Sequence, residues 1–174
     1  RTEDDMIQAC NVTLRLGKRA LFEDVNIKFT EGNCYGLIGA NGAGKSTTIK
    51  MITGILKPTE GDIFIDGINM AKEPVKCKAS FGYVPDNPDV YERLTGLDYL
   101  NFMADVYNVS VFERKERINK YTEIFNIKGA INQQIKSFSH GMRQKLVITG
   151  ALIHQPKLWI LDEPMVGLDP MSAK

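Results

Sequence analysis

The sequence has no long apolar run and almost no excess of charge of either sign. No apolar stretch approaches the roughly 20 residues that a membrane-spanning helix needs. Any work at a membrane is therefore expected to depend on docking onto the helices of another protein. The 22 basic and 21 acidic residues leave a net charge of +1. That charge gives no large field toward nucleic acid, so we expect no nucleic-acid partner.

Cysteine is scarce as well. Cys10, Cys34 and Cys77 are scattered, odd in number and outside any metal-ligand spacing. We interpret them as reduced thiols of a cytosolic protein, with Cys34 packed in the core. Apolar residues make up 43% and charged residues 25% of the chain, the profile of a soluble globular protein.

The clearest feature that is present is a glycine-rich loop. It reads Gly39, Ala40, Asn41, Gly42, Ala43, Gly44, Lys45, Ser46, Thr47, and fits Gly, four residues, then Gly-Lys-Ser/Thr. The apolar run Cys34 to Ile38 before it has the length and bounding glycines of a buried strand, and Thr48 to Thr53 can continue as a helix. Such a loop and the positive end of a helix converge on one anion. The pattern predicts a nucleotide site.

Two side chains of this loop have roles of their own. Lys45 adds a full positive charge aimed at the β- and γ-phosphates, so we class it with the catalytic residues. The Ser46 hydroxyl can bind Mg²⁺.

A second motif lies near the end of the chain. Leu158 to Leu161 predicts a buried parallel strand that runs into Asp162 and Glu163. In open α/β sheets ligands bind at this carboxyl edge. Asp162 is placed to hold Mg²⁺, and Glu163 can orient and deprotonate the water that attacks the γ-phosphate. Taken alone, two solvated acids at a strand end would be an equally good interpretation, but the phosphate loop favours catalysis.

The rest of the chain predicts strands first and helices later. Apolar patterns predict strands at 6–14, 21–29, 63–65 and 81–84. Thr95 with Asp98 and Ser110 with Glu113 have the spacing of helix starts, so we expect two or three helices between 88 and 135. Helical periodicity resumes at Met142 and stops at Pro156.

These patterns predict an α/β fold, a phosphate-loop NTPase core with a mixed sheet and a helical insertion. Residues 1–87 would form the first part of the core, 88–135 the helical subdomain, and 136–174 the return to the core.

Taken in order, the motifs resemble the ATP-binding subunit of an ATP-binding cassette (ABC) transporter of the ABC-2 exporter type. Gly39–Thr47 is similar to the family's Walker A loop, and Leu158–Asp162 with Glu163 to its Walker B strand and catalytic glutamate. Val166–Asp169 looks like the D-loop that crosses the dimer interface.

The segment Phe138–Met142 stands where the family carries its Leu-Ser-Gly-Gly-Gln signature. Ser139 and Gly141 match the signature, whereas His140 and Met142 do not. Ser139 also stands at a predicted helix start, where free N–H groups and a hydroxyl form an anion site. An ordinary serine N-cap is the alternative.

The resemblance implies that the chain binds ATP and Mg²⁺ and hydrolyses the ATP at the interface with a second ABC ATPase subunit, identical or different. Hydrolysis would energise a transmembrane export permease, with the protein on the cytoplasmic face of the cell membrane. Two alternatives stay open: a soluble ABC ATPase that acts on ribosomes or DNA, and a regulatory subunit that binds ATP and barely hydrolyses it.

Three departures from the family pattern affect these roles. Asp86 replaces a glutamine and could bind Mg²⁺, while Leu16 replaces the aromatic residue that stacks on adenine. The sequence also stops soon after Asp169, before the family's switch histidine, for which His140 and His154 are no substitutes. We therefore expect a C-terminally truncated chain with weak activity or none.

Overall fold

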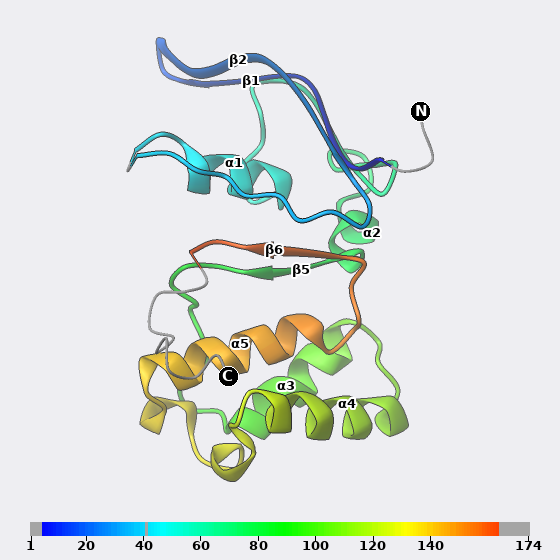
Figure 1. Cartoon of the computed structure of the whole chain (residues 1–174), viewed down its shortest axis with the longest axis vertical. Helices are drawn as coiled ribbons and strands as arrows, with labels where there is room; N and C mark the ends of the chain where they lie inside the picture. Colours follow the sequence, from blue (N-terminus) through cyan, green and yellow to red (C-terminus); the bar gives the residue numbers. More distant parts are fainter. Residues whose placement is uncertain (1–4, 41, 164–174) are drawn as a thin grey trace. The chain divides into compact units, whose positions relative to one another are not determined.

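A computed structural model of the chain describes residues 5–40 and 42–163. The chain divides into two compact units, residues 1–81 and residues 82–174 (Figure 1). Among the described residues, none of the helices combines the length and the apolar character needed to cross a bilayer. The predicted division at 87 and 135 stays a prediction.

The first unit is built on an antiparallel sheet. β1 (Asp5–Leu16) and β2 (Arg19–Thr30) form the long blue hairpin of Figure 1. β3 (Glu60–Ile65) pairs with the other edge of β1, and β4 (Ile68–Asn69) completes the order β2-β1-β3-β4. All three pairings are antiparallel. The strands expected at 6–14, 21–29 and 63–65 are confirmed.

Two helices accompany this sheet. α1 (Lys45–Ile52) buries Ile49, Met51 and Ile52. The sequence patterns missed α2 (Pro74–Ala79), although proline at its first position is a recognised helix-start signal. α2 carries Cys77, whose buried thiol donates to the Ile68 carbonyl at 3.3 Å. Burial raises the pKa of this thiol, so Cys77 rather than Cys34 is the core cysteine.

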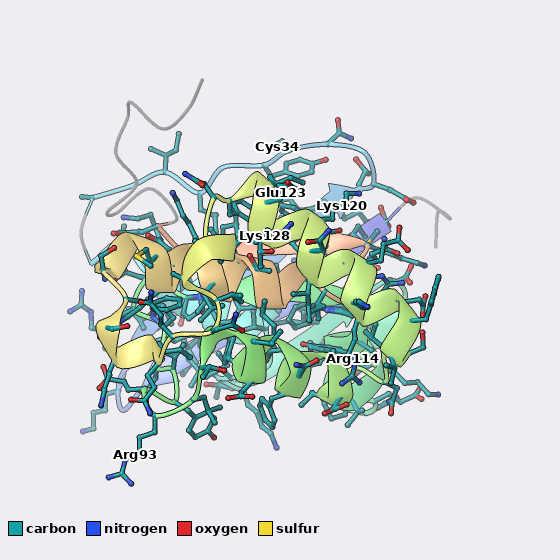
Figure 2. All side chains as sticks on the ribbon, turned by 90° about the horizontal axis from the view of Figure 1, so that it is seen from below. Cys34, Arg93, Arg114, Lys120, Glu123 and Lys128 are labelled. Carbon is teal, nitrogen blue, oxygen red and sulfur yellow. The ribbon has the colours of Figure 1, made fainter. Side chains whose placement is uncertain are left out.

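The strand predicted at Cys34 to Ile38 is wrong. Residues 33–40 adopt no strand, Cys34 (labelled in Figure 2) is exposed, and Ile38 is 99% exposed. A strand forms only when a neighbouring strand accepts and donates its ladder of hydrogen bonds. The four strands of this unit pair with one another and none pairs with the segment.

The second unit carries a pair of short strands, β5 (Phe81–Val84) and β6 (Leu158–Leu161). Their arrows point the same way in Figure 1, so the predicted parallel direction is confirmed. The predicted burial of β6 is wrong, because Trp159 is 52% and Leu161 39% exposed while Ile160 is buried. This alternation is that of a strand covered on one face only.

The other described elements of the second unit are helical. They are α3 (Gly96–Val106), α4 (Val111–Ile124) and α5 (His140–Leu152), with 3₁₀ turns η1 (Lys128–Ala130) and η2 (Ile135–Ser137). The predicted starts of α3 and α4 are confirmed. Thr95 Oγ1 accepts from the Asp98 N–H at 3.1 Å, and the Asp98 carboxylate accepts from the Thr95 N–H at 3.2 Å. Ser110 caps α4 by accepting from the Glu113 N–H.

Side chains of the three helices form a closed apolar core. Its fully buried members include Leu100, Ile135, Leu146 and Ile153. Tyr99 lies in the same core, where burial, followed by the effect of Tyr107, raises the pKa of its phenol to about 12.

The His154 ring stacks on the Tyr107 ring at 3.7 Å between centroids. His154 is half-buried.

Candidate nucleotide-binding site

The phosphate loop turns tightly into the start of α1. Gly42 and Gly44 have backbone φ angles of 81° and 91°, which residues with a side chain rarely adopt. Gly44 is the N-cap of the helix. The Thr48 N–H and Oγ1 both donate to the Gly44 carbonyl, at 2.8 and 3.0 Å. The helix begins at Lys45, three residues before the predicted Thr48, so Lys45, Ser46 and Thr47 occupy its first turn.

Gly44 also lies against the sheet of its unit. A Cβ at this position would approach the Phe22 ring to 2.7 Å. Glycine is therefore required at Gly44 for space as well as for backbone conformation. The sequence patterns did not single out Phe22, although its apolar ring on a polar hairpin was the available signal.

Lys45 folds back over the loop that precedes it. Its ammonium donates to the carbonyls of Gly39 at 2.7 Å and Ala40 at 3.2 Å. The Ala43 N–H donates to the same Ala40 carbonyl at 3.1 Å, which closes the turn. The positive charge is thus held beside the loop's own backbone, where the pattern requires it. Asn41 lies outside the described residues.

An apolar hollow of about 310 Å³ lies beside this loop. The hairpin contributes Phe22, Val25 and Ile27, and the helical side contributes Gly44, Lys45 and Met51, among others. Leu16 ends β1 at the turn of the hairpin, and its side chain lies outside those described. The role predicted for Leu16 at the base stays a prediction.

Two of the predicted metal-binding aspartates follow the paired strands of the second unit. The Asp162 N–H donates to the Val84 carbonyl at 2.9 Å, so the ends of β5 and β6 are joined where Asp86 follows. Asp162 is buried and Asp86 is exposed. Burial, followed by the charges of Asp162 and Asp86, raises the pKa of the Tyr83 phenol. Tyr83 lies in β5 close enough to both aspartates to feel their charges, and the sequence patterns missed it.

Glu163 follows directly and is exposed, with φ of 48°. A positive φ is uncommon outside glycine, and such conformations gather at functional sites. The described residues contain no cluster of three or more histidine, cysteine, aspartate or glutamate side chains arranged to hold a metal ion. That finding is compatible with Mg²⁺, which is usually held by one or two carboxylates together with substrate phosphates.

Ser139 is the N-cap of α5, as expected. Its Oγ accepts from the Met142 N–H at 3.3 Å, and its carbonyl accepts from the Arg143 N–H at 3.0 Å. Gly141 lies in the first turn of the helix. Asp169 lies outside the described residues. The structure thus confirms the helix start at Ser139, while its function toward a second subunit stays a prediction.

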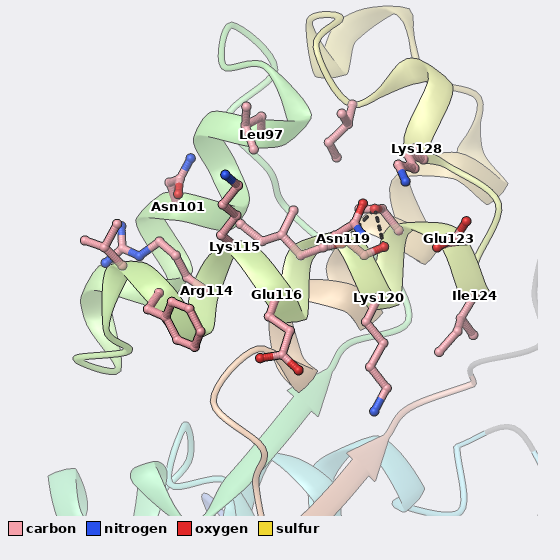
Figure 3. Close-up of a pocket in the computed structure, with 15 residues that line it drawn as sticks. Leu97, Asn101, Arg114, Lys115, Glu116, Asn119, Lys120, Glu123, Ile124 and Lys128 are labelled. Atoms are coloured by element: carbon pink, nitrogen blue, oxygen red, sulfur yellow. Dashed lines mark hydrogen bonds between the residues drawn. The ribbon is translucent and has the colours of Figure 1, made fainter.

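A larger hollow, of about 1210 Å³, lies along α4 and contains none of the predicted site residues. Figure 3 shows Leu97 and Asn101 of α3 and Lys128 of η1 around it. Size alone would point to this groove, but the sequence motifs predict phosphate chemistry at Gly39–Thr47 and at the acids after β6.

Comparison with known proteins places these motifs in one family. The family described as "ABC transporter" matches residues 22–166. The linearmycin resistance ATP-binding protein of Bacillus subtilis is 37% identical over 96% of this chain and 54% of its own length. The bacitracin transport ATP-binding protein of Bacillus licheniformis is 36% identical over 97% of this chain and 54% of its own length. The chain thus spans about half the length of these relatives.

Solved structures agree with the sequence comparison. The structure of an ATP-binding subunit of an ABC transporter matches with a TM-score of 0.90 and 35% identity, over 96% of this chain and 70% of that one. A bacterial ABC transporter cassette, solved as a dimer, matches with a TM-score of 0.84 and 27% identity, over 96% of this chain and 78% of that one. The phosphate loop, the acids after β6 and the serine at the start of α5 all lie in the matched region, and the chain belongs to the ABC transporter family.

Proposed function

We propose that this chain binds Mg-ATP on the loop Gly39–Thr47 and hydrolyses it in a head-to-tail dimer that energises a transmembrane export permease. The observation that carries the proposal is the placement of Lys45. Its ammonium lies over the Gly39 and Ala40 carbonyls at the N-terminus of α1. A fixed cation, loop N–H groups and a helix N-terminus together favour the charge of a triphosphate.

Three side chains have the chemistry to hold Mg²⁺ beside the phosphates. Ser46 offers a hydroxyl oxygen, Asp162 a buried carboxylate and Asp86 an exposed one, and oxygen donors are those that Mg²⁺ prefers. A Mg²⁺ ion held by these side chains would neutralise charge on the β- and γ-phosphates. Asp86 would serve in place of the glutamine expected from the family pattern.

Glu163 is the proposed general base. Its carboxylate is exposed after β6, next to Asp162, and is free of the strand ladder. From there it would orient a water molecule for in-line attack on the γ-phosphate and accept its proton. Its left-handed backbone conformation is the kind that persists where function requires it.

The N-cap role of Ser139 is compatible with a role toward a second subunit. Its Oγ uses a lone pair to accept from the Met142 N–H, and a hydroxyl keeps one hydrogen to donate. That hydrogen and the free N–H groups at the start of α5 would face the γ-phosphate held by the partner's loop. Gly141 and Asp169 would complete this face, and the relative solved as a dimer supports the assembly.

Membership of the family supports the proposed permease and the proposed location. The names of the relatives refer to bacitracin transport and linearmycin resistance, which supports an export role at the cytoplasmic face of a membrane. Leu16 would cover one face of the adenine without the stacking of an aromatic ring. We propose no nucleic-acid partner, in keeping with the net charge of +1.

Two variants of the whole protein test the proposal. Lys45→Ala should weaken Mg-ATP binding by about 10- to 100-fold in calorimetry, since a charge-assisted contact to the phosphates is lost. Glu163→Gln should keep ATP affinity but lower the rate of phosphate release by about 10²- to 10⁴-fold.

Lys50→Ala is the matched control, because Lys50 is an exposed lysine on the same helix α1. It should bind and hydrolyse like the parent protein. Unchanged affinity in Lys45→Ala would remove the phosphate loop as the site. A parental rate in Glu163→Gln would remove Glu163 as the base.

A further inference from the structure

A closed ring of three residues holds the segment that leads into Ser139. The Lys136 N–H donates to the Glu92 carbonyl at 3.0 Å. The Lys136 carbonyl accepts from Nη2 of Arg143 at 3.3 Å. Nη1 of Arg143 pairs with Oε1 of Glu92 at 2.8 Å, which returns to the starting residue. Each member of the ring is therefore held by the other two.

The ring lies one helical turn from Ser139. The Arg143 N–H donates to the Ser139 carbonyl at 3.0 Å within the first turn of α5. Lys136 is the middle residue of η2, the turn that ends directly before Phe138. Arg143 therefore makes two contacts around this serine. Its backbone N–H binds the Ser139 carbonyl, and its side chain binds the Lys136 carbonyl, three residues before Ser139.

A neighbouring contact extends this arrangement. The Ile135 N–H donates to the Leu94 carbonyl at 2.9 Å, and the Ile135 side chain is fully buried. The approach to Ser139 is thereby fixed against residues 92–94, the loop that runs from β5 toward α3. Within the ring, the link between this loop and α5 is the ion pair of the Arg143 guanidinium with Glu92.

The energetics of the ring favour positioning over stability. Its ion pair joins side chains that are 31% and 55% exposed, and exposed ion pairs contribute little to folding. A fixed geometry can nevertheless matter for a reaction, because a displacement of about 1 Å in a positioning group can cost roughly 10²-fold in rate. A contact of small stabilising value is therefore able to have a large effect on activity.

We propose that Glu92 and Arg143 are positioning residues for the second anion site, and that they set where Ser139 meets the γ-phosphate of the nucleotide held by the other subunit. This inference rests on the proposed function. Neither residue belongs to the loop Gly39–Thr47, so their loss should affect the dimer and its turnover rather than ATP binding by one subunit.

The test uses Arg143→Met and Glu92→Gln in the whole protein. ATP-driven dimerisation is measured by analytical ultracentrifugation in a Glu163→Gln background, and turnover is measured with Glu163 present. Each variant should weaken the dimer and lower kcat by about five- to tenfold, an effect within the range found for residues in contact. ATP affinity of the dilute monomer and the thermal midpoint should stay at the parent values.

A charge exchange, Glu92→Arg with Arg143→Glu, restores the ion pair and should recover part of the dimer affinity, whereas a loss that does not depend on this pair would not be recovered. Arg117→Met is the matched control. Arg117 pairs with Glu113 and donates to the Ile153 carbonyl at 2.9 Å, the same combination of contacts away from Ser139. It should leave dimerisation unchanged.

The inference is overturned if Arg143→Met and Glu92→Gln dimerise and turn over like the parent, or if Arg117→Met weakens the dimer equally. If Arg143→Met does not fold, Glu92→Gln decides, because it removes only a charge at an exposed side chain. A parent protein that binds ATP and never dimerises would instead overturn the proposed function, which distinguishes the two failures.

Discussion

Apolar side chains are buried in the helical core of the second unit but exposed in the segment before the phosphate loop. Leu100, Ile135 and Leu146 are fully buried among α3, η2 and α5. By contrast, Leu37 is 44% and Ile38 99% exposed in a segment of similar apolar character. The difference shows that hydrophobicity alone did not decide which stretch became ordered secondary structure.

Hydrogen-bond range accounts for the difference. A helix satisfies most of its backbone groups within four residues, and the caps at Thr95 and Ser110 each supply one further local partner. A strand depends on a neighbour that is distant in sequence. Residues 34–38 have no such neighbour among the strands of their unit, so the same apolar content leads to an extended, exposed segment.

The largest expected effect comes from replacing a buried isoleucine, and the same replacement at an exposed isoleucine tests the contrast in burial. Ile127→Ala should destabilise the second unit by about 2–5 kcal/mol, because Ile127 is 2% exposed in its core. Ile38→Ala should change the stability of the first unit by less than about 0.5 kcal/mol, since Ile38 is exposed. Native-state hydrogen exchange of each unit measures both. A large loss in Ile38→Ala would show that this segment is packed in solution.

One pH effect should arise in the helical core. Because the pKa of Tyr99 rises from about 10 in the unfolded chain to about 12 in the folded one, the folded state favours the protonated phenol. This stability is complete below pH 10 and is lost as the pH rises to 12, by roughly 3 kcal/mol. Urea unfolding followed by the fluorescence of Trp159, the one tryptophan, measures it.

Tyr99→Phe should remove that part of the pH dependence, whereas Tyr91→Phe, at an exposed position, should not. If the two variants lose stability in parallel above pH 10, the buried phenol is not the cause.

A smaller effect should distinguish two glycines of the first unit. Gly44→Ala should cost about 1–3 kcal/mol, because it combines a positive φ with a contact to the Phe22 ring. Gly17 also has a positive φ, but no atom lies near the position of an added Cβ. Gly17→Ala should therefore cost only about 1 kcal/mol of stability. Hydrogen exchange in β1 and β2 reports both. In a Phe22→Leu background the loss of stability caused by Gly44→Ala should be smaller, while the loss caused by Gly17→Ala should stay the same. If Gly44→Ala costs the same stability with Phe22 and with Leu at position 22, the contact does not contribute.

The smallest effect concerns a helix cap. Thr95→Ala should destabilise the second unit by about 1 kcal/mol, since the Asp98 N–H loses its partner. Thr95→Ser keeps the hydroxyl and should stay close to the parent in the same urea experiment. If Ala and Ser behave alike, the cap does not contribute to the stability of α3.

The sequence by itself determined the features that depend on near neighbours. The glycines of Gly39–Thr47 indicated a tight turn into a helix, and the spacing of Thr95 with Asp98 indicated the start of α3. Ser139 was correctly expected at the start of α5. In each case the interacting groups lie within a few residues of one another, so their chemistry can be inferred from their order.

Only the tertiary structure decided the features that join distant residues. It left Cys34 and Ile38 exposed, placed Phe22 against Gly44, and brought Asp86 and Asp162 to Tyr83. The ring of Glu92, Lys136 and Arg143 is of the same kind. Such contacts depend on which strands find partners and on how loops close, and these are cooperative outcomes of the whole fold that no local spacing encodes.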